Sequence, residues 1–225
     1  MDLQIIGVMM YLVNIFLSFI LAIIIIEKLY ISKKFSKEQD FHFYNDLFSW
    51  EMFYIFIGIE SVLKIVSMFL SFNNVISYIL LRVRILIFFF PFWTKIIHLE
   101  KVMNKITYDR HYYAGVIPLI ITLVLGFTSI SNIILIFIFF CTTFSLLFFF
   151  FIFFKNTGTE RSKTLKILFG TIVIGVGYLL KPEILERYSE ISKILETLIV
   201  LSNITVPILF IIGLLLIFDS YRKEL

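Results

Sequence analysis

The stretch IIGVMMYLVNIFLSFILAIIII, residues 5–26, runs for 22 positions without a charged side chain. A helix needs about 20 mostly apolar residues to cross the hydrocarbon core of a bilayer. The run has this length, and it is longer than the apolar region of a signal peptide. It also lacks the basic segment and the small-residue cleavage site that mark such a peptide. The sequence therefore predicts that residues 5–26 form an uncleaved first membrane helix.

The composition of the whole chain is also strongly apolar. Of its 225 residues, 60% are hydrophobic and 16% are charged, and 28 are phenylalanine. A soluble domain is about 45–50% apolar and about 25% charged. A soluble core of this size would leave much of the apolar surface in water, so the excess is expected to face lipid. We therefore expect an integral membrane protein.

Seven runs along the chain are long and apolar enough for membrane helices. They are residues 5–26, 52–71, 76–97, 113–129, 132–154, 165–180 and 197–218. The runs occupy nearly the whole chain, so residues 1–225 are expected to form a single domain. The predicted fold class is all-α, a polytopic membrane protein built as a bundle of seven transmembrane helices.

Lysine and arginine residues gather in alternate connections between these runs. Of the 20 basic residues, 14 fall on one side, in three connections and the C-terminal tail, whereas only Lys181, Arg187 and Lys193 fall on the other. Connections rich in lysine and arginine remain in the cytoplasm. The chain is therefore expected to cross the cell membrane several times, with its N-terminus outside and its C-terminus in the cytoplasm.

The predicted second helix, residues 52–71, carries two charged residues, Glu60 and Lys64. A charge near the middle of a bilayer costs roughly 2.5–3.5 kcal/mol on insertion scales. A glutamate four residues before a lysine is the favourable order for pairing on one helix face. Ser67 and Ser71 continue that face, so the helix is expected to present one polar side.

The predicted third helix, residues 76–97, carries Arg82 and Arg84. Two residues apart, they point about 200° away from one another, because 3.6 residues make one helical turn. The face of Arg84 continues to Pro91 and polar residues, whereas the face of Arg82 continues with apolar residues. We therefore expect Arg84 to point into the bundle and Arg82 to extend to the outer membrane surface.

The depth of the charges predicts that the second and third helices share a polar network. The short connection between them makes them antiparallel neighbours. At 1.5 Å per residue, Lys64 and Arg84 both lie about 10 Å below the outer boundary, and Glu60 lies about one turn deeper. A guanidinium can reach a carboxylate one turn away. We therefore expect Glu60, Lys64 and Arg84 to interact.

Two interpretations of this network remain open. In the first, Arg84 and Lys64 contact a small polar or anionic ligand in a pocket that opens outward, and Glu60 organises them. In the second, the charges form a buried ion pair that fixes the packing of two helices and binds nothing else. The residue types fit both.

Prolines, glycines and one asparagine interrupt the apolar runs. They are Pro91, Pro118, Gly170, Gly175, Gly177, Asn203 and Pro207. Such residues mark hinges in some membrane helices and close helix packing in others. Packing is the more frequent role, and we expect it here. A similar row of small and polar residues, Gly7, Tyr11, Asn14 and Ser18, follows one face of the first helix.

Several kinds of chemistry have no counterpart in the sequence. The single cysteine, Cys141, excludes an internal disulfide, and the three histidines lack the spacing of a helical metal pair. The nucleophile elbow, the zinc protease motif and the glycine-rich phosphate loop are all missing. We therefore expect no metal, no cofactor and no nucleic-acid partner, and an enzyme is the less favoured class.

One pattern resembles a known family. Arg84 is followed by PFW at 91–93 and by a basic exit, HLEK at 98–101, and the first inner connection, EKLYISKKFSKEQ at 27–39, is basic. Together with the helix count and orientation, this arrangement is similar to the seven-helix membrane input domains of prokaryotic sensor proteins, including sensor histidine kinases and archaeal relatives. The resemblance implies a receptor-like or sensor-like protein. Because the chain ends at DSYRKEL, a cytoplasmic partner at the basic inner connections would carry the signal.

Two other function classes remain open at this stage. The chain has the size of a small membrane transporter or a transporter subunit, although no internal repeat is visible. It also fits a structural membrane subunit without a ligand of its own. The polar residues gather in the outer half of the predicted bundle. This distribution favours sensing over transport, because transport needs polar groups on a path that reaches both sides.

Overall fold

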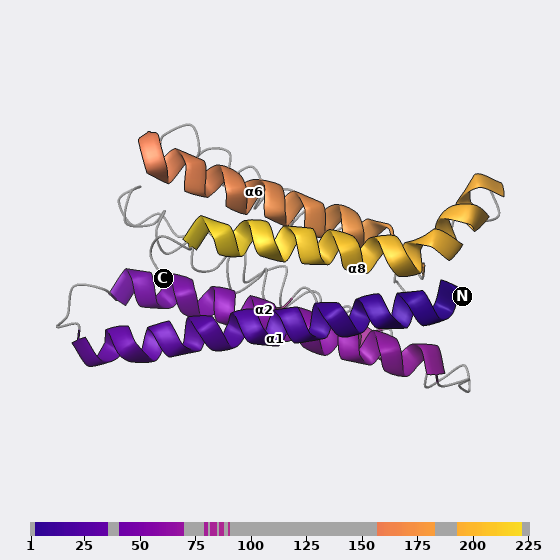
Figure 1. The fold of residues 1–225 in the computed structure, drawn as a ribbon, viewed down its shortest axis with the longest axis horizontal. Helices are drawn as coiled ribbons and strands as arrows, with labels where there is room; N and C mark the ends of the chain where they lie inside the picture. The colour runs from indigo at the N-terminus through magenta and orange to yellow at the C-terminus, as the bar shows by residue number, and fades with distance from the viewer. Residues whose placement is uncertain are drawn as a thin grey trace. The chain divides into compact units, whose positions relative to one another are not determined.

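The computed structural model describes four long stretches and several short pieces of the chain. The long stretches are residues 3–35, 41–69, 157–182 and 193–221, and the short pieces are residues 79–80, 82–84, 86–87 and 90. Within these residues, all regular secondary structure is helical. The long helices are α1 at Leu3–Phe35, α2 at Phe41–Phe69, α6 at Gly158–Leu179 and α8 at Lys193–Tyr221 (Figure 1).

Each of the four helices contains a segment long and apolar enough to cross a membrane. The segments are Ile5–Lys28, Trp50–Phe69, Arg161–Leu179 and Leu201–Tyr221. They correspond to the predicted runs at 5–26, 52–71, 165–180 and 197–218. The regular secondary structure of the described residues is thus helical, and four of its helices could cross a membrane, as expected for a membrane protein.

The helices are longer than the apolar runs that predicted them. α1 continues through Glu27 and Lys28 as far as Phe35, and α2 begins at Phe41, well before its apolar segment. Backbone hydrogen bonding carries a helix beyond the hydrocarbon core, because lysine, glutamate and similar residues are good helix formers in water. The apolar runs thus identified the helices but placed their ends too close together.

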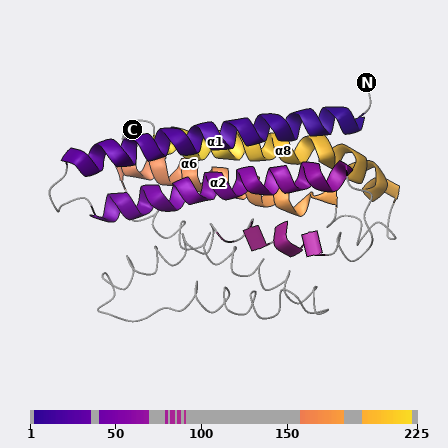
Figure 2. The ribbon, with the colours of Figure 1, turned by 90° about the horizontal axis from the view of Figure 1, so that it is seen from below.

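The remaining predicted helices fall largely on other parts of the chain. The runs at 113–129 and 132–154 lie outside the described residues, as do Pro91 and Pro118. Of the run at 76–97, only the short pieces are described, and these are helical. Figure 2 shows them beside α2.

One side of α1 exposes large apolar side chains over most of its length. Phe16, Ile20 and Ile23 are each more than half exposed, whereas Tyr11 and Ile25 are buried. A soluble protein would cover so long an apolar face, because exposed apolar patches promote association. In a bilayer the same face contacts lipid, as the composition led us to expect.

The chain divides into two compact units. Met1–Ser18 and Phe148–Leu225 form the first, which we name the terminal unit, and Phe19–Leu147 form the second, which we name the central unit. α6, α8 and the first half of α1 thus belong to the terminal unit. α2, the pieces between residues 79 and 90, and the second half of α1 belong to the central unit.

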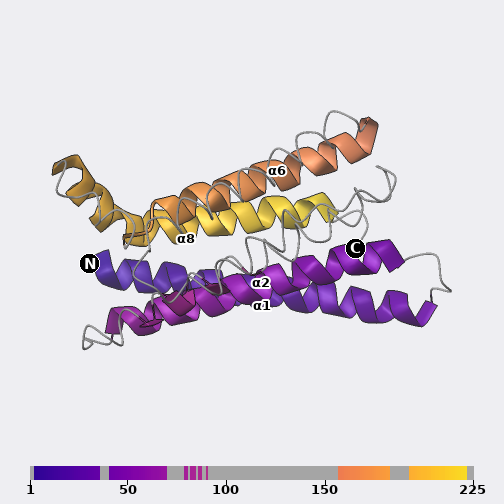
Figure 3. The same cartoon turned by 180° about the vertical axis from the view of Figure 1, so that it is seen from behind.

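In the terminal unit, α6 and α8 pack side by side in antiparallel directions (Figures 1 and 3). Their backbones come closest where Gly170 faces Gly213. A Cβ atom on either glycine would lie 2.7 Å from the carbonyl oxygen of the other. Small residues at a crossing point let two membrane helices approach closely and gain packing energy. The core on either side includes Ile174, Phe210 and Leu214, all fully buried.

Polar contacts join α6 to α8 at both ends of this pair. The Nζ atom of Lys166 donates a hydrogen bond to Oδ2 of Asp219 at 2.5 Å, between two exposed side chains. The Nζ atom of Lys163 lies 4.3 Å from the ring centre of Tyr221. At the opposite end, Nζ of Lys181, which follows α6, lies 5.5 Å from the ring centre of Phe210 in α8. The two helices thus make contacts through charged side chains at their ends and pack closely in their middle.

Candidate functional site

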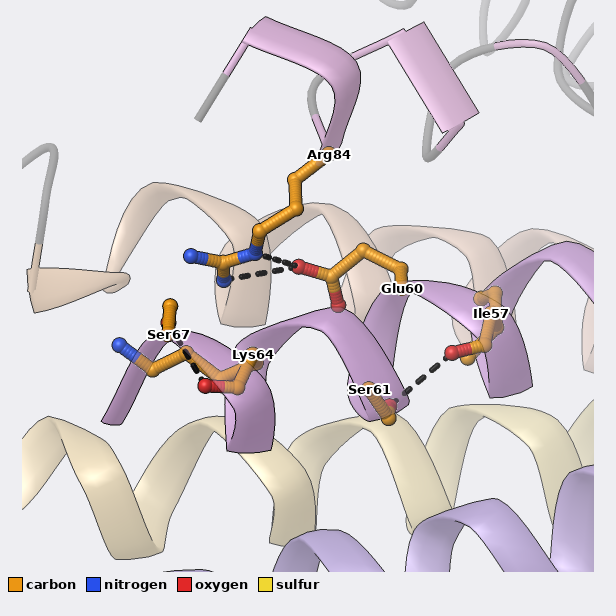
Figure 4. Close-up of polar contacts among 6 residues, drawn as sticks. All are labelled: Ile57, Glu60, Ser61, Lys64, Ser67 and Arg84. Atoms are coloured by element: carbon orange, nitrogen blue, oxygen red, sulfur yellow. Dashed lines mark hydrogen bonds and ion pairs between the residues drawn. The ribbon is translucent and has the colours of Figure 1, made fainter. Parts of the chain in front are cut away.

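The candidate site is built around an ion pair in the central unit. Arg84 donates two hydrogen bonds to Glu60, from Nε at 3.2 Å and from Nη2 at 2.9 Å, and both go to the same oxygen, Oε1. Figure 4 shows Arg84 reaching from its short helical piece to the carboxylate on α2. The contact that the sequence predicted between these two residues is present in the structure.

The charged groups around this pair lie away from solvent. Glu60, Lys64, Arg82 and Arg84 are each between 0 and 6% exposed. Among the described residues of the central unit, these are the buried charged side chains, and three of the four are cations. Charges this deep interact strongly, because the surrounding protein screens them far less than water does.

Lys64 lies one helical turn along α2 from Glu60. Figure 4 shows the Glu60 carboxylate and the Lys64 ammonium on opposite sides of the Arg84 guanidinium. The hydroxyl of Ser67 donates to the backbone carbonyl of Lys64 at 2.6 Å, and that of Ser61 donates to the carbonyl of Ile57 at 3.0 Å. Both serines therefore bond within their own helix. The charged groups on this part of α2 are Glu60 and Lys64.

The expectation for Arg82 is wrong. Its side chain was expected to extend to the outer membrane surface from an apolar face, but it is only 5% exposed. Arg82 and Arg84 are both in helical conformation and point to nearly opposite sides. Because both are buried, protein covers this piece of helix on two sides. An apolar face in the sequence indicated lipid, whereas in the structure it faces protein.

The residues expected to bend or pack the helices have distinct surroundings. A Cβ atom on Gly170 would be in severe contact, and one on Gly177 would lie 3.0 Å from the ring of Phe210, whereas one on Gly175 would meet nothing within 4 Å. Gly170 and Gly177 therefore allow close packing of α6 on α8, as expected, and Gly175 does not contribute to it.

Asn203 and Pro207 lie in the part of α8 that faces the start of α1. A Cβ atom on Gly7 would lie 3.1 Å from the backbone oxygen of Asn203 and 3.2 Å from its Cβ atom. Pro207 is buried inside the helix, which continues on both sides of it. Asn203 therefore belongs to a close helix contact, and Pro207 lies one turn further along the same helix.

The burial of Lys181 in the terminal unit was not predicted from the sequence, which placed it in an outer connection. Lys181 is 5% exposed, and its Nζ atom lies 4.7 Å from the ring centre of Tyr178 and 5.5 Å from that of Phe210. A cation over aromatic faces is stabilised by the charge distribution of the rings. The tyrosine three residues before the lysine was a usable signal, whereas Phe210 is too distant in sequence to have been one.

The described residues offer no site for a metal ion. Nowhere among them do three or more histidine, cysteine, aspartate or glutamate side chains come together. The chemistry available at the candidate site is therefore that of its charges. Arg84 binds the carboxylate of Glu60, and Lys64 adds a second buried cation one turn along α2, which suits either the binding of a small anion or a purely structural ion pair.

Comparison with the known protein families, with characterised proteins and with solved structures gives no match for this chain.

Proposed function

We propose that the chain is a seven-helix, multi-pass protein of the cell membrane, with its N-terminus outside and its C-terminus in the cytoplasm. In this proposal it acts as a receptor-like or sensor-like protein. It binds a small polar or anionic ligand in the outer half of the membrane and signals through a cytoplasmic partner. The observation that carries the proposal is the buried cluster of Arg84, Lys64 and Glu60, in which the carboxylate of Glu60 orients the Arg84 guanidinium and Lys64 adds a second buried cation.

Each residue has a distinct role in the proposed site. Glu60 holds Arg84 through the Nε and Nη2 atoms, which fixes the plane of the guanidinium. Figure 4 shows the Lys64 ammonium on the side of that guanidinium away from Glu60, and the proposed anion binds between these two cations. Arginine is suited to planar anions such as carboxylate and phosphate, and lysine adds a point charge. Arg82 is also buried but points to the other side of its helical piece, so it has no assigned role in the site.

Basic residues at the start of α6 support the proposed output. Arg161 is exposed, and Lys166 contacts α8 near its end through Asp219. A shift of α6 against α8 would therefore alter a basic surface on the predicted cytoplasmic side. A signalling partner with an acidic surface would respond to such a change.

A structural role is the second candidate, and one observation favours it. The Arg84–Glu60 pair is itself a buried, hydrogen-bonded link between α2 and the segment that follows it. Removing one member of such a pair is strongly destabilising whether or not a ligand binds. A test must therefore change the anion affinity without breaking this pair.

The test uses Lys64→Met in the full chain, reconstituted in lipid nanodiscs. Acetate and inorganic phosphate serve as probes, and the melting temperature is measured against anion concentration at constant ionic strength. A bound ligand stabilises by about 2.7 kcal/mol at one hundred times its Kd. We expect saturable stabilisation of the unmodified chain and its loss in Lys64→Met. Lys166→Met is the matched control, because Lys166 is exposed and lies in the terminal unit. Equal curves for all three proteins would favour the structural role.

A further inference from the structure

A second polar feature of the molecule lies in the terminal unit, where α8 meets the start of α1. Pro207 has no backbone N–H, so the carbonyl of Asn203, four residues earlier, lacks the donor that a regular helix would supply. The side-chain oxygen Oδ1 of the same residue is buried. Within the part of the chain that the structure describes, it has no hydrogen-bond partner. Two acceptor oxygens of one residue thus lie at a break in the hydrogen bonding of α8.

Gly7 covers one side of this break. A Cβ atom at Gly7 would lie 3.1 Å from the backbone oxygen of Asn203, so the glycine allows the backbone of α1 to lie against that carbonyl. A Cα–H group makes a weak hydrogen bond to a carbonyl, which is worth less than an N–H donor. The contact therefore covers the carbonyl from one side without supplying an N–H donor, and Oδ1 has no partner among the described residues.

A buried acceptor without a donor is costly, and in lipid no bulk water is present to relieve it. The group that fits two neighbouring acceptors is a small neutral molecule with two donors. Water has two hydrogens and commonly satisfies buried polar groups in this way. A monovalent cation would need several more oxygen ligands than this residue supplies.

We propose that Asn203 binds a buried water molecule, which donates one hydrogen to its backbone carbonyl and the other to Oδ1. The water replaces the hydrogen bond that Pro207 removes. The backbone hydrogen bonding of α8 is therefore interrupted at Asn203, where the water takes the place of a backbone N–H donor. Gly7 of α1 packs against this point of α8. This site is independent of the Arg84–Glu60 cluster and of any ligand that binds there.

The experiment exploits a pair of residues that occurs once in the chain. Val206–Pro207 is the only Val-Pro sequence, so carbonyl ¹³C-valine with ¹⁵N-proline labels one peptide bond, next to the proposed water. Magnetisation transfer from water to this carbonyl is measured by solid-state NMR on the full chain in lipid vesicles. Gly213–Leu214, which is also unique and is buried in α8, gives the dry reference.

We expect transfer to Val206 to be several-fold faster than transfer to Gly213, and to fall toward the reference in Asn203→Leu. This variant removes the side-chain acceptor while nearly preserving its volume. Pro207→Ala restores the N–H donor and is expected to slow the transfer as well, measured at the new and unique Val-Ala bond. The second variant keeps the test decisive if the first fails to fold.

Three results would overturn the proposal. One is slow magnetisation transfer to Val206 in the unmodified chain, which would mean that no water lies beside Asn203. Another is fast transfer that Asn203→Leu leaves unchanged, which would place the water elsewhere. The third is a Val206 carbonyl resonance that shifts between sodium-containing and sodium-free buffer, because this would assign a cation to the site.

Discussion

Arg84 and Glu60 are joined by two hydrogen bonds that share a single acceptor, Oε1 of the carboxylate. The two residues are 24 positions apart, and both are almost completely buried. The pair therefore connects the helical piece at residues 82–84 to α2, and both charges are buried in the protein. Its stability depends on both members being present.

Glu60→Ala tests this dependence. The variant leaves the Arg84 guanidinium buried without its carboxylate, and removing one partner of a buried ion pair costs about 3–5 kcal/mol. We expect a large decrease in melting temperature for the purified protein in detergent. Ser61→Ala is the matched control, because Ser61 is also buried on α2 but carries no charge. A decrease no larger than that of the control would show that the pair contributes little.

Replacing both members by apolar residues should be milder than removing either one. In Glu60→Leu with Arg84→Met no charge is left buried, and such replacements of a buried pair are often neutral or stabilising. A double-mutant cycle measures the coupling as the difference between the double variant and the sum of the single variants. Additive effects would contradict a direct interaction. If the ligand proposal holds, the double variant is also expected to lose its response to phosphate.

The sequence predicted the contact of Arg84 with Glu60 because a short connection and the rise of a helix set the depth of each charge. It also identified the four described membrane segments, because their apolar runs are long. The burial of Arg82 was not predictable in this way. Which neighbour covers a helix face depends on tertiary packing, and an apolar face suits protein and lipid equally well. For the same reason the aromatic surroundings of Lys181, which include Phe210 of another helix, were missed.

The glycine contact between α6 and α8 is expected to be intolerant of a single methyl group. In Gly170→Ala the new Cβ atom would lie 2.7 Å from both the carbonyl oxygen of Gly213 and Cγ1 of Ile217. Overpacking of this kind costs about 1–3 kcal/mol. Gly175→Ala is the control, because a Cβ atom there meets nothing within 4 Å.

An alanine in place of glycine inside a helix is otherwise favourable by about 0.5–1 kcal/mol. We therefore expect Gly170→Ala to lower the melting temperature and Gly175→Ala to leave it unchanged or raise it slightly. Equal effects in the two variants would show that α6 and α8 do not approach one another as closely as in this structure.

The ion pair between Lys166 and Asp219 is expected to contribute little to stability. Both side chains are exposed, at 40% and 47%, and exposed pairs are worth less than about 1 kcal/mol. Asp219→Asn should therefore change the free energy of unfolding far less than Glu60→Ala does. The small effect should also weaken in high salt, which screens exposed charges. A salt-independent loss comparable with that of Glu60→Ala would contradict this assignment.

The side of the membrane reached by two exposed positions tests the number of helices that precede α6. Leu3 lies at the start of α1 and Thr159 at the start of α6, and both are exposed. Five crossings between them, as the seven-helix arrangement requires, would place the two on opposite sides. Two crossings, by α1 and α2 alone, would place them on the same side. Single cysteines at these positions, in a Cys141→Ser background, are labelled in intact cells with a membrane-impermeant maleimide. Since basic connections remain in the cytoplasm, we expect Leu3→Cys to react at once and Thr159→Cys to react only after permeabilisation.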